Sequence, residues 1–184
     1  MDMGAACEGE TVLVIGGGVI GLMAVQLAKL AGAKVLLLTR SPEKQTLGLN
    51  AGADYAVGTE SEVRAIWPEG ADLVVECAGV SATVTLSHKL ARSGGRVVIL
   101  GVISQGEQVP IEPFDMLFRE IQMHFSFLNP FTHERAAKMI ADGTINVSPL
   151  ISRTISLEEA ALAISSPPPK GEVRAIVVPN HDQN

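Results

Sequence analysis

After the first apolar run of this 184-residue chain, Gly16, Gly18 and Gly21 have the spacing Gly-x-Gly-x-x-Gly. The first allows a tight turn, the second lets a pyrophosphate approach the backbone, and the third lets a helix pack closely. A helix N-terminus also offers free N–H groups and a positive dipole end to phosphates. The spacing therefore predicts a dinucleotide site, with a glycine-rich structural turn as the alternative. Its candidate residues are Gly16, Gly18, Val19, Ile20 and Gly21.

The second apolar run, Lys34–Leu38, ends without the acidic residue that binds the ribose hydroxyls in NAD-binding domains. Thr39 occupies that position, so a 2′-phosphate would meet no repulsion there, and the permanent cation of Arg40 follows. Ser41 and Lys44 are further candidates for this contact. These residues favour NADP over NAD. In the alternative interpretation, Arg40 lies over the adenine ring and Lys44 is a solvated helix residue.

Side chains that could polarise a substrate or move a proton are scarce in this sequence. The four histidines are scattered without ligand spacing, and Cys7 and Cys77 do not form a zinc cluster. Glu76 is expected at the cofactor end of its strand, where a structural role is favoured over a catalytic one. The sequence thus predicts neither catalytic nor metal-binding residues in this chain.

Apolar runs alternate with helical patterns along the chain, as parallel strands covered on both faces would require. Strands are predicted over Thr11–Ile15, Lys34–Leu38, Tyr55–Val57, Asp72–Glu76, Arg96–Leu100 and Ile121–Phe127. Helices are predicted over Val19–Ala31 and His133–Asp142, and after the N-cap residues Ser41, Thr59 and Ser156. The pattern indicates an α/β Rossmann fold, with a six-stranded doubly wound parallel sheet and helices on both faces.

The same pattern suggests how the chain is divided. Residues 1–10 form a lead-in, 11–150 the dinucleotide-binding domain, 151–179 a C-terminal segment and 180–184 a polar tail. The net charge is −6 and Lys and Arg form no block, which argues against nucleic acid or an anionic membrane as partners. No apolar run reaches the ~18 residues of a membrane span, and no basic secretory signal opens the chain. With only two cysteines, a cytoplasmic location is expected.

Taken together, the motifs from Gly9 to Pro179 resemble the nucleotide-binding part of zinc-dependent medium-chain alcohol dehydrogenases, especially the sorbitol and threonine dehydrogenase branch. The segments that carry this resemblance are Gly9–Gly21, Leu30–Ala33, Arg40–Lys44, Ala51–Asp54, Ala71–Gly79, Gly94–Gly101, Ser126–Pro130, Pro149–Ile151 and Leu157–Ala160. In combination they are far more specific than the glycine motif alone.

The resemblance implies positions for the rest of the cofactor. Ala78 and Gly79 would border the adenosine side, and Leu100, Gly101 and Val102 would line the nicotinamide end, with Ser126 and Phe127 nearby. It also implies that the edge strand near Ile121–Phe127 forms a homodimer, and that residues 151–179 return toward a catalytic domain.

The implied activity is hydride transfer between a secondary alcohol or polyol and NADP or NAD. In such enzymes the zinc and its ligands belong to an N-terminal GroES-like domain, which we expect to be absent from this chain. A stand-alone cofactor-binding module or redox sensor, and a zinc-free quinone-reductase relative, are the alternatives.

Overall fold

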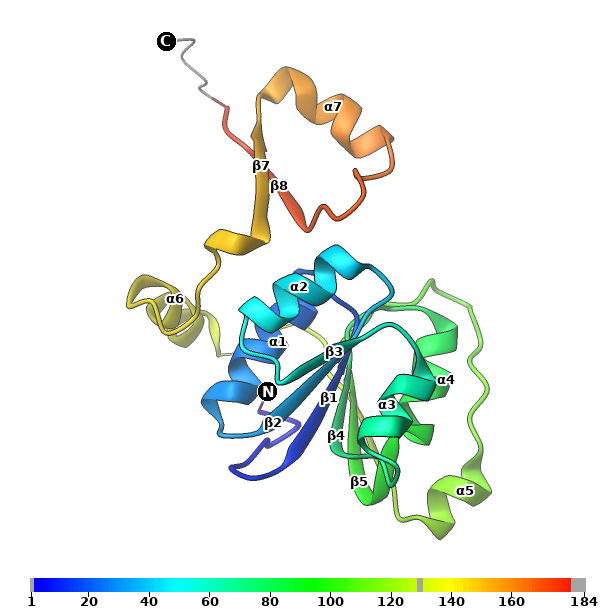
Figure 1. Cartoon of the computed structure of the whole chain (residues 1–184). Coiled ribbons are helices and arrows are strands. Elements are labelled where there is room, and N and C mark those ends of the chain that lie inside the picture. Colours follow the sequence, from blue (N-terminus) through cyan, green and yellow to red (C-terminus); the bar gives the residue numbers. More distant parts are fainter. Residues whose placement is uncertain (1, 129–130, 180–184) are drawn as a thin grey trace.

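The glycine motif lies at the middle of a six-stranded parallel sheet (Figure 1). The computed structural model describes residues 2–128 and 131–179. The strands are β1 (Thr11–Ile15), β2 (Lys34–Leu38), β3 (Tyr55–Val57), β4 (Ala71–Glu76), β5 (Ala91–Ile99) and β6 (Gln122–Phe125). Their order is β3-β2-β1-β4-β5-β6, and every neighbouring pair is parallel. This confirms the predicted doubly wound sheet, whose order reverses between β1 and β4.

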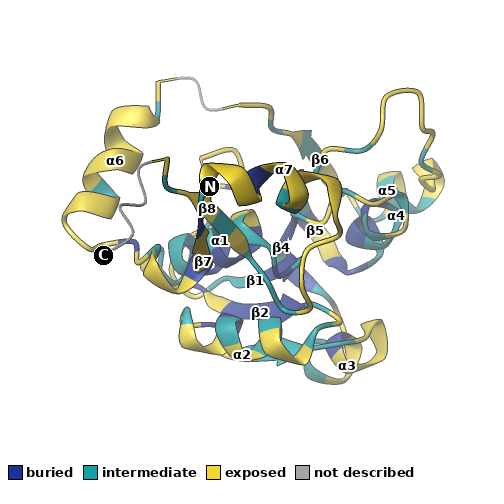
Figure 2. Cartoon of the chain, turned by 90° about the horizontal axis from the view of Figure 1, so that it is seen from above, coloured by how far each residue is buried: buried dark blue, intermediate teal, exposed yellow. Residues whose placement is uncertain are grey.

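Helices cover both faces of this sheet because successive strand residues point to opposite sides. The helices are α1 (Val19–Leu30), α2 (Pro42–Asn50), α3 (Glu60–Ile66), α4 (Ser81–Lys89), α5 (Pro113–Phe118), α6 (His133–Ala141) and α7 (Leu157–Ser165). Val12 and Val14 of β1 share one core with α1, whereas Leu13 and Ile15 share the other with α3 and α4. Figure 2 shows burial concentrated in the central strands, with α6 and α7 largely exposed.

The predicted helix starts are confirmed. The Ser41 hydroxyl accepts a hydrogen bond from the Lys44 backbone N–H, directly before Pro42 at the first position of α2. Thr59 with Glu62 forms a complete capping box at α3, and Ser156 with Glu159 forms another at α7. The turn that leaves β2 is therefore held by local hydrogen bonds.

Several predicted boundaries were wrong. β5 begins at Ala91 rather than Arg96, because an irregular stretch pairs with β4 before the regular ladder resumes. Apart from Ala91, the first residues of β5 are polar or glycine, so a search for apolar runs does not detect this stretch. β6 is limited to Gln122–Phe125, within the predicted Ile121–Phe127. β4 begins one residue earlier than predicted, and α1 and α6 each end one residue earlier.

The C-terminal segment forms a unit of its own. After a 3-10 turn at Ser148–Leu150, β7 (Ile151–Ile155) and β8 (Arg174–Val177) pair as a second, two-stranded parallel sheet, with α7 between them. β8 lies within the mainly apolar residues Val173–Val178, whereas most residues of β7 are exposed and form no apolar run in the sequence. Figure 1 shows this unit above α2. The predicted tail, residues 180–184, lies outside the described residues.

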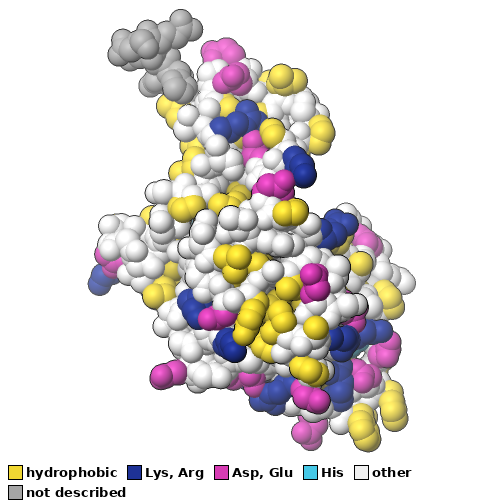
Figure 3. Space-filling view, viewed as in Figure 1, with side chains coloured by type: hydrophobic (Ala, Val, Ile, Leu, Met, Phe, Trp, Pro, Cys, Tyr) yellow, Lys and Arg dark blue, Asp and Glu magenta, His cyan; other side chains and the backbone are white. Residues whose placement is uncertain are grey.

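The surface carries charges of both signs. On the face drawn in Figure 3, acidic and basic side chains are intermixed rather than gathered into one patch. None of the described helices has the length and apolar character needed to cross a bilayer.

Candidate cofactor-binding site

The three motif glycines have two different environments. Gly16 has φ +107°, and a Cβ atom there would lie 2.9 Å from the Ala78 amide nitrogen. A Cβ atom on Gly21 would lie 1.8 Å from the carbonyl oxygen of Gly16, so α1 packs directly on the turn. A Cβ atom on Gly18, in contrast, would meet nothing within 4 Å. The first and third glycines are thus required by the fold, whereas the second faces open space that a ligand could occupy.

The N-terminus of α1 is suited to an anion. Gly18 is its N-cap, without a side-chain cap, and the first turn contains no acidic residue. The first intrahelical bond runs from the Leu22 N–H to the Gly18 carbonyl, which leaves the preceding N–H groups without an intrahelical acceptor. Val19 packs against the core and Ile20 is half exposed. These features fit a diphosphate at the open side of Gly18.

Gly17, a position that the motif spacing leaves variable, connects the loop to β2. A Cβ atom on Gly17 would lie 2.9 Å from both Thr39 Oγ1 and Lys44 Cβ. Thr39 is held in place, since its N–H donates to the Val57 carbonyl and its own carbonyl accepts from Gln45 Nε2 at 2.8 Å. The glycine loop therefore touches the end of β2 and the first turn of α2. The glycine fingerprint leaves this middle position variable, so no motif signal could have identified it.

Two cations, Arg40 and Lys44, lie at the end of β2 and in the first turn of α2. Arg40 is exposed, and neither its guanidinium nor the Lys44 ammonium makes a hydrogen bond or ion pair with any residue in the described ranges. The Ser41 hydroxyl is different, because it caps α2 and donates to Glu43 Oε2 at 2.6 Å. Thr39 and Lys44 thus lie beside the glycine loop and Arg40 follows Thr39 in the chain, while the Ser41 hydroxyl is already hydrogen-bonded.

On the other side of the loop, Glu76 organises the end of β4. Its side chain is fully buried, and Oε1 accepts hydrogen bonds from Ala78 N, Gly79 N and Thr83 Oγ1 at 2.8, 3.0 and 2.8 Å. Its backbone carbonyl also accepts from the N–H groups of Leu100 and Gly101. Glu76 is therefore a positioning residue that orders the turn after β4.

Glycine is required where the ends of β4 and β5 meet. A Cβ atom on Gly101 would lie 2.3 Å from Gly79 N and 2.4 Å from Glu76 Oε2. A Cβ atom on Gly79, where φ is +67°, would lie 2.8 Å from the Val102 carbonyl oxygen. Gly79, predicted to border the adenosine, is therefore in direct contact with Gly101 and Val102, predicted to line the nicotinamide end.

Ser126, Val102 and Phe127, the remaining residues predicted near the nicotinamide, follow the ends of β5 and β6. The Ser126 N–H donates to the Ile99 carbonyl at 3.0 Å, which places Ser126 beside the end of β5. Val102 and Phe127 are 79% and 77% exposed, so neither side chain is used by the core. The candidate residues thus lie along the carboxyl ends of β2, β1, β4, β5 and β6, where ligands bind in open α/β sheets.

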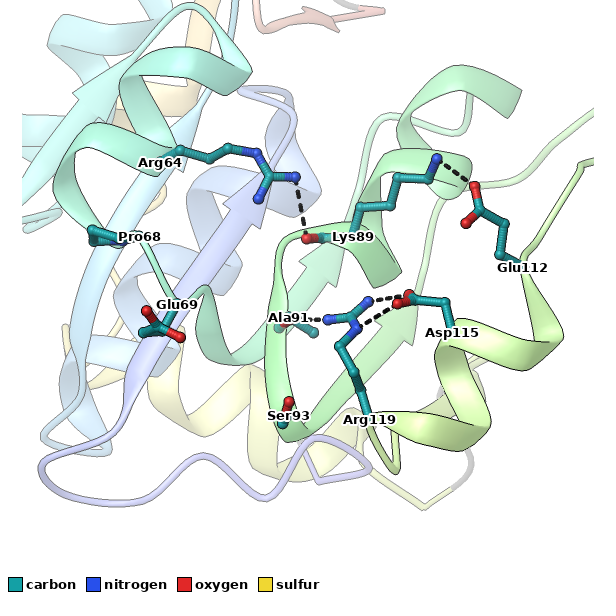
Figure 4. Close-up of a pocket in the computed structure, with 9 residues that line it drawn as sticks. All are labelled: Arg64, Pro68, Glu69, Lys89, Ala91, Ser93, Glu112, Asp115 and Arg119. Carbon is teal, nitrogen blue, oxygen red and sulfur yellow. Dashed lines mark hydrogen bonds and ion pairs between the residues drawn. The ribbon is translucent and has the colours of Figure 1, made fainter.

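A separate cavity of about 360 Å³ lies at the opposite end of the sheet (Figure 4). It is lined by Arg64, Pro68, Glu69, Lys89, Ala91, Ser93, Glu112, Asp115 and Arg119. Lys89 pairs with Glu112 at 2.7 Å and Arg119 pairs with Asp115, so these charges neutralise one another. None of the predicted cofactor residues lines this cavity. Within residues 2–128 and 131–179, no group of three His, Cys, Asp or Glu side chains is placed to hold a metal ion.

Curated relatives match most of the chain. Sorbitol dehydrogenase of Mus musculus is 29% identical over 172 residues, covering 89% of this chain and 48% of the relative. D-arabinitol dehydrogenase 1 of Uromyces fabae is 29% identical over 182 residues, covering 94% and 52%. The chain thus spans about half the length of the curated relatives that it matches.

Solved structures agree with this match. A Sinorhizobium meliloti 1021 protein, assigned to the zinc-binding dehydrogenases and bound to NADP, superposes with a TM-score of 0.93 at 50% identity. The match covers 97% of this chain and 55% of that one. Alcohol dehydrogenase TADH from Thermus sp. ATN1 superposes with a TM-score of 0.88 at 28% identity, covering 97% and 55%. Residues 19–142 match the zinc-binding dehydrogenase family, and because this is more than half of the sequence, the chain belongs to that family.

Proposed function

We propose that this chain binds NADP(H) along the carboxyl end of the sheet, as the cofactor-binding part of a zinc-dependent alcohol or polyol dehydrogenase. The observation that carries the proposal is the open side of Gly18 at an uncapped helix N-terminus, together with Arg40 at the end of β2 and Lys44 in the first turn of α2, whose charges have no partner among the described residues. The proposed contacts with the pyrophosphate are Gly16, Gly18, Val19, Ile20 and Gly21, and those on the adenosine side are Thr39, Arg40, Ser41, Lys44, Ala78 and Gly79. Leu100, Gly101 and Val102 would line the nicotinamide end, with Ser126 and Phe127 nearby.

The proposed reaction is hydride transfer between a secondary alcohol or polyol and the cofactor. The names of the relatives, sorbitol and arabinitol dehydrogenase, support this substrate class. We place the zinc ligands outside residues 1–184, and residues 11–150 as the cofactor domain. Residues 151–179 would then return to the catalytic part, consistent with the exposed Leu157, Leu162 and Ile164 on α7. Both cysteines are free thiols, which supports a reducing, cytoplasmic setting.

Direct titration of the 1–184 polypeptide tests the proposal. We expect NADPH to bind saturably at one site per chain, with enhanced nicotinamide fluorescence and displacement by NADP. The physical reason is that the anion site at Gly18 is formed before any ligand arrives. Failure of both NADPH and NADH to saturate, in a preparation shown to be folded by circular dichroism, would contradict it.

A homodimer through β6 is the second expected outcome. Among the described residues β6 pairs with β5 alone, at the end of the sheet, and Phe125 in β6 and Phe127 just after it are 68% and 77% exposed. An apolar edge of this kind favours pairing with a second copy. Light scattering at tens of micromolar should report a dimer, and Phe125→Glu should make it a monomer. Met123 packs against the core, so a charge there would unfold the edge rather than test it.

The matched control for Phe125→Glu is Phe114→Glu, which adds the same charge at an 80% exposed position on α5. A wild-type monomer, or a dimer that survives Phe125→Glu, would exclude this edge as the interface.

A further inference from the structure

The first turn of α2 contains an anion, Glu43, three residues after Arg40, which is the residue proposed to bind the 2′-phosphate. Glu43 lies two residues after Ser41, and its Oε2 atom accepts the Ser41 hydroxyl at 2.6 Å. Its Oε1 atom lies 3.2 Å from Lys170 Nζ. Lys170 comes from the loop between α7 and β8, outside the six-stranded sheet. A cation of the C-terminal unit thus faces an anion in the first turn of α2, three residues after Arg40.

This contact is built into the packing of the two segments. Gly171 has φ +80°, and a Cβ atom there would lie 3.3 Å from Glu43 Cβ, so the backbone of the loop touches the first turn of α2. The loop is closed by a hydrogen bond from Glu172 N to the Pro169 carbonyl at 3.0 Å. It is tied to β7 by the ion pair of Arg153 with Glu172 at 2.6 Å. Figure 1 shows the loop descending toward α2.

Glu43 is charged at every physiological pH. The Ser41 hydroxyl, the backbone N–H of Glu43 itself and the Lys170 ammonium together lower the pKa of Glu43 to about 2. A phosphate held by Arg40 would therefore lie near a permanent negative charge, and two like charges repel. This repulsion would apply to NADP and not to NAD, whose ribose carries no phosphate.

We propose that Lys170 is a specificity-determining residue: by pairing with Glu43 it neutralises the anion three residues after Arg40 and so permits the 2′-phosphate of NADP to bind. The inference rests on the proposed function and adds a second element to it. Two parts of the chain, the turn after β2 and the C-terminal unit, would then determine which cofactor binds at the adenosine end.

The test compares NADPH and NADH binding by calorimetry. Lys170→Ala should lower the affinity for NADPH about three- to fivefold at low salt and leave the affinity for NADH unchanged. The factor is modest because the ion pair of Lys170 with Glu43 is exposed to solvent. Added salt should shrink the effect. Glu43→Gln in the Lys170→Ala background should restore NADPH binding, because the uncompensated charge is then gone. Rescue of this kind is not expected if Lys170 only holds the loop.

Lys138→Ala is the matched control, since it removes one exposed cation from α6 and changes the net charge equally. The NADPH to NADH ratio should stay at the wild-type value in this control. If Arg40→Ala removes the NADPH advantage but Lys170→Ala leaves it intact, or if Glu43→Gln fails to rescue, the role of Lys170 is refuted alone. If the wild-type chain shows no NADPH advantage, the proposed cofactor preference fails and this inference fails with it.

Discussion

The Arg40→Ala variant is expected to lose most of the preference for NADPH over NADH. The Arg40 guanidinium is exposed at the end of β2 and makes no hydrogen bond or ion pair with the described part of the chain. A charge-assisted contact with the 2′-phosphate, reduced by solvent exposure, corresponds to about a tenfold change in affinity. Calorimetry with both cofactors should show NADPH weakened by this factor and NADH nearly unchanged.

Thr39→Asp should act in the opposite direction, because a carboxylate there would repel the phosphate and accept the ribose hydroxyls. NADH should then bind more tightly than NADPH. Lys34→Ala is a suitable control, since it removes a cation from the other end of the same strand. Equal weakening of both cofactors by Arg40→Ala would instead indicate that Arg40 lies over the adenine ring.

Gly18→Ala and Gly21→Ala should separate binding from folding. A methyl group on Gly18 meets no atom within 4 Å, so the free energy of unfolding should stay within about 1 kcal/mol of wild type. It would nevertheless occupy the space proposed for the pyrophosphate, and both cofactors should bind at least about tenfold more weakly. On Gly21 the methyl group would collide with the Gly16 carbonyl oxygen at 1.8 Å. That variant should be destabilised by about 1–3 kcal/mol or more.

Urea unfolding and cofactor titration on the same two proteins measure both effects. A stable Gly18→Ala protein with wild-type affinity would show that the pyrophosphate does not approach this glycine. A Gly21→Ala protein with wild-type stability would show that α1 does not need to contact the turn after β1.

Local chemistry determined much of this protein. Ser41, directly before Pro42, starts α2 through a hydrogen bond to the Lys44 N–H, only three residues away. The capping box of Thr59 and Glu62 starts α3 in the same local way. The alternation of apolar runs with helical patterns was enough to predict the parallel sheet and the helices on both of its faces. Gly21 could be assigned because the helix that follows the turn packs on Gly16, only five residues earlier, and Gly16 because the turn itself requires its positive φ. Motif spacing therefore predicted both the fold and the end of the sheet that holds the candidate site.

Only the tertiary structure could decide contacts between segments that are distant along the chain. Gly17 is required because Thr39 and Lys44 come against it from the next unit. Glu76 is a buried positioning residue because Thr83 and the turn after β4 fold back onto its carboxylate. Lys170 faces Glu43 across more than a hundred residues, through an exposed loop with no sequence signature. Contacts of this kind depend on how complete helices, strands and loops pack against one another, and hydrophobic periodicity carries no information about that packing.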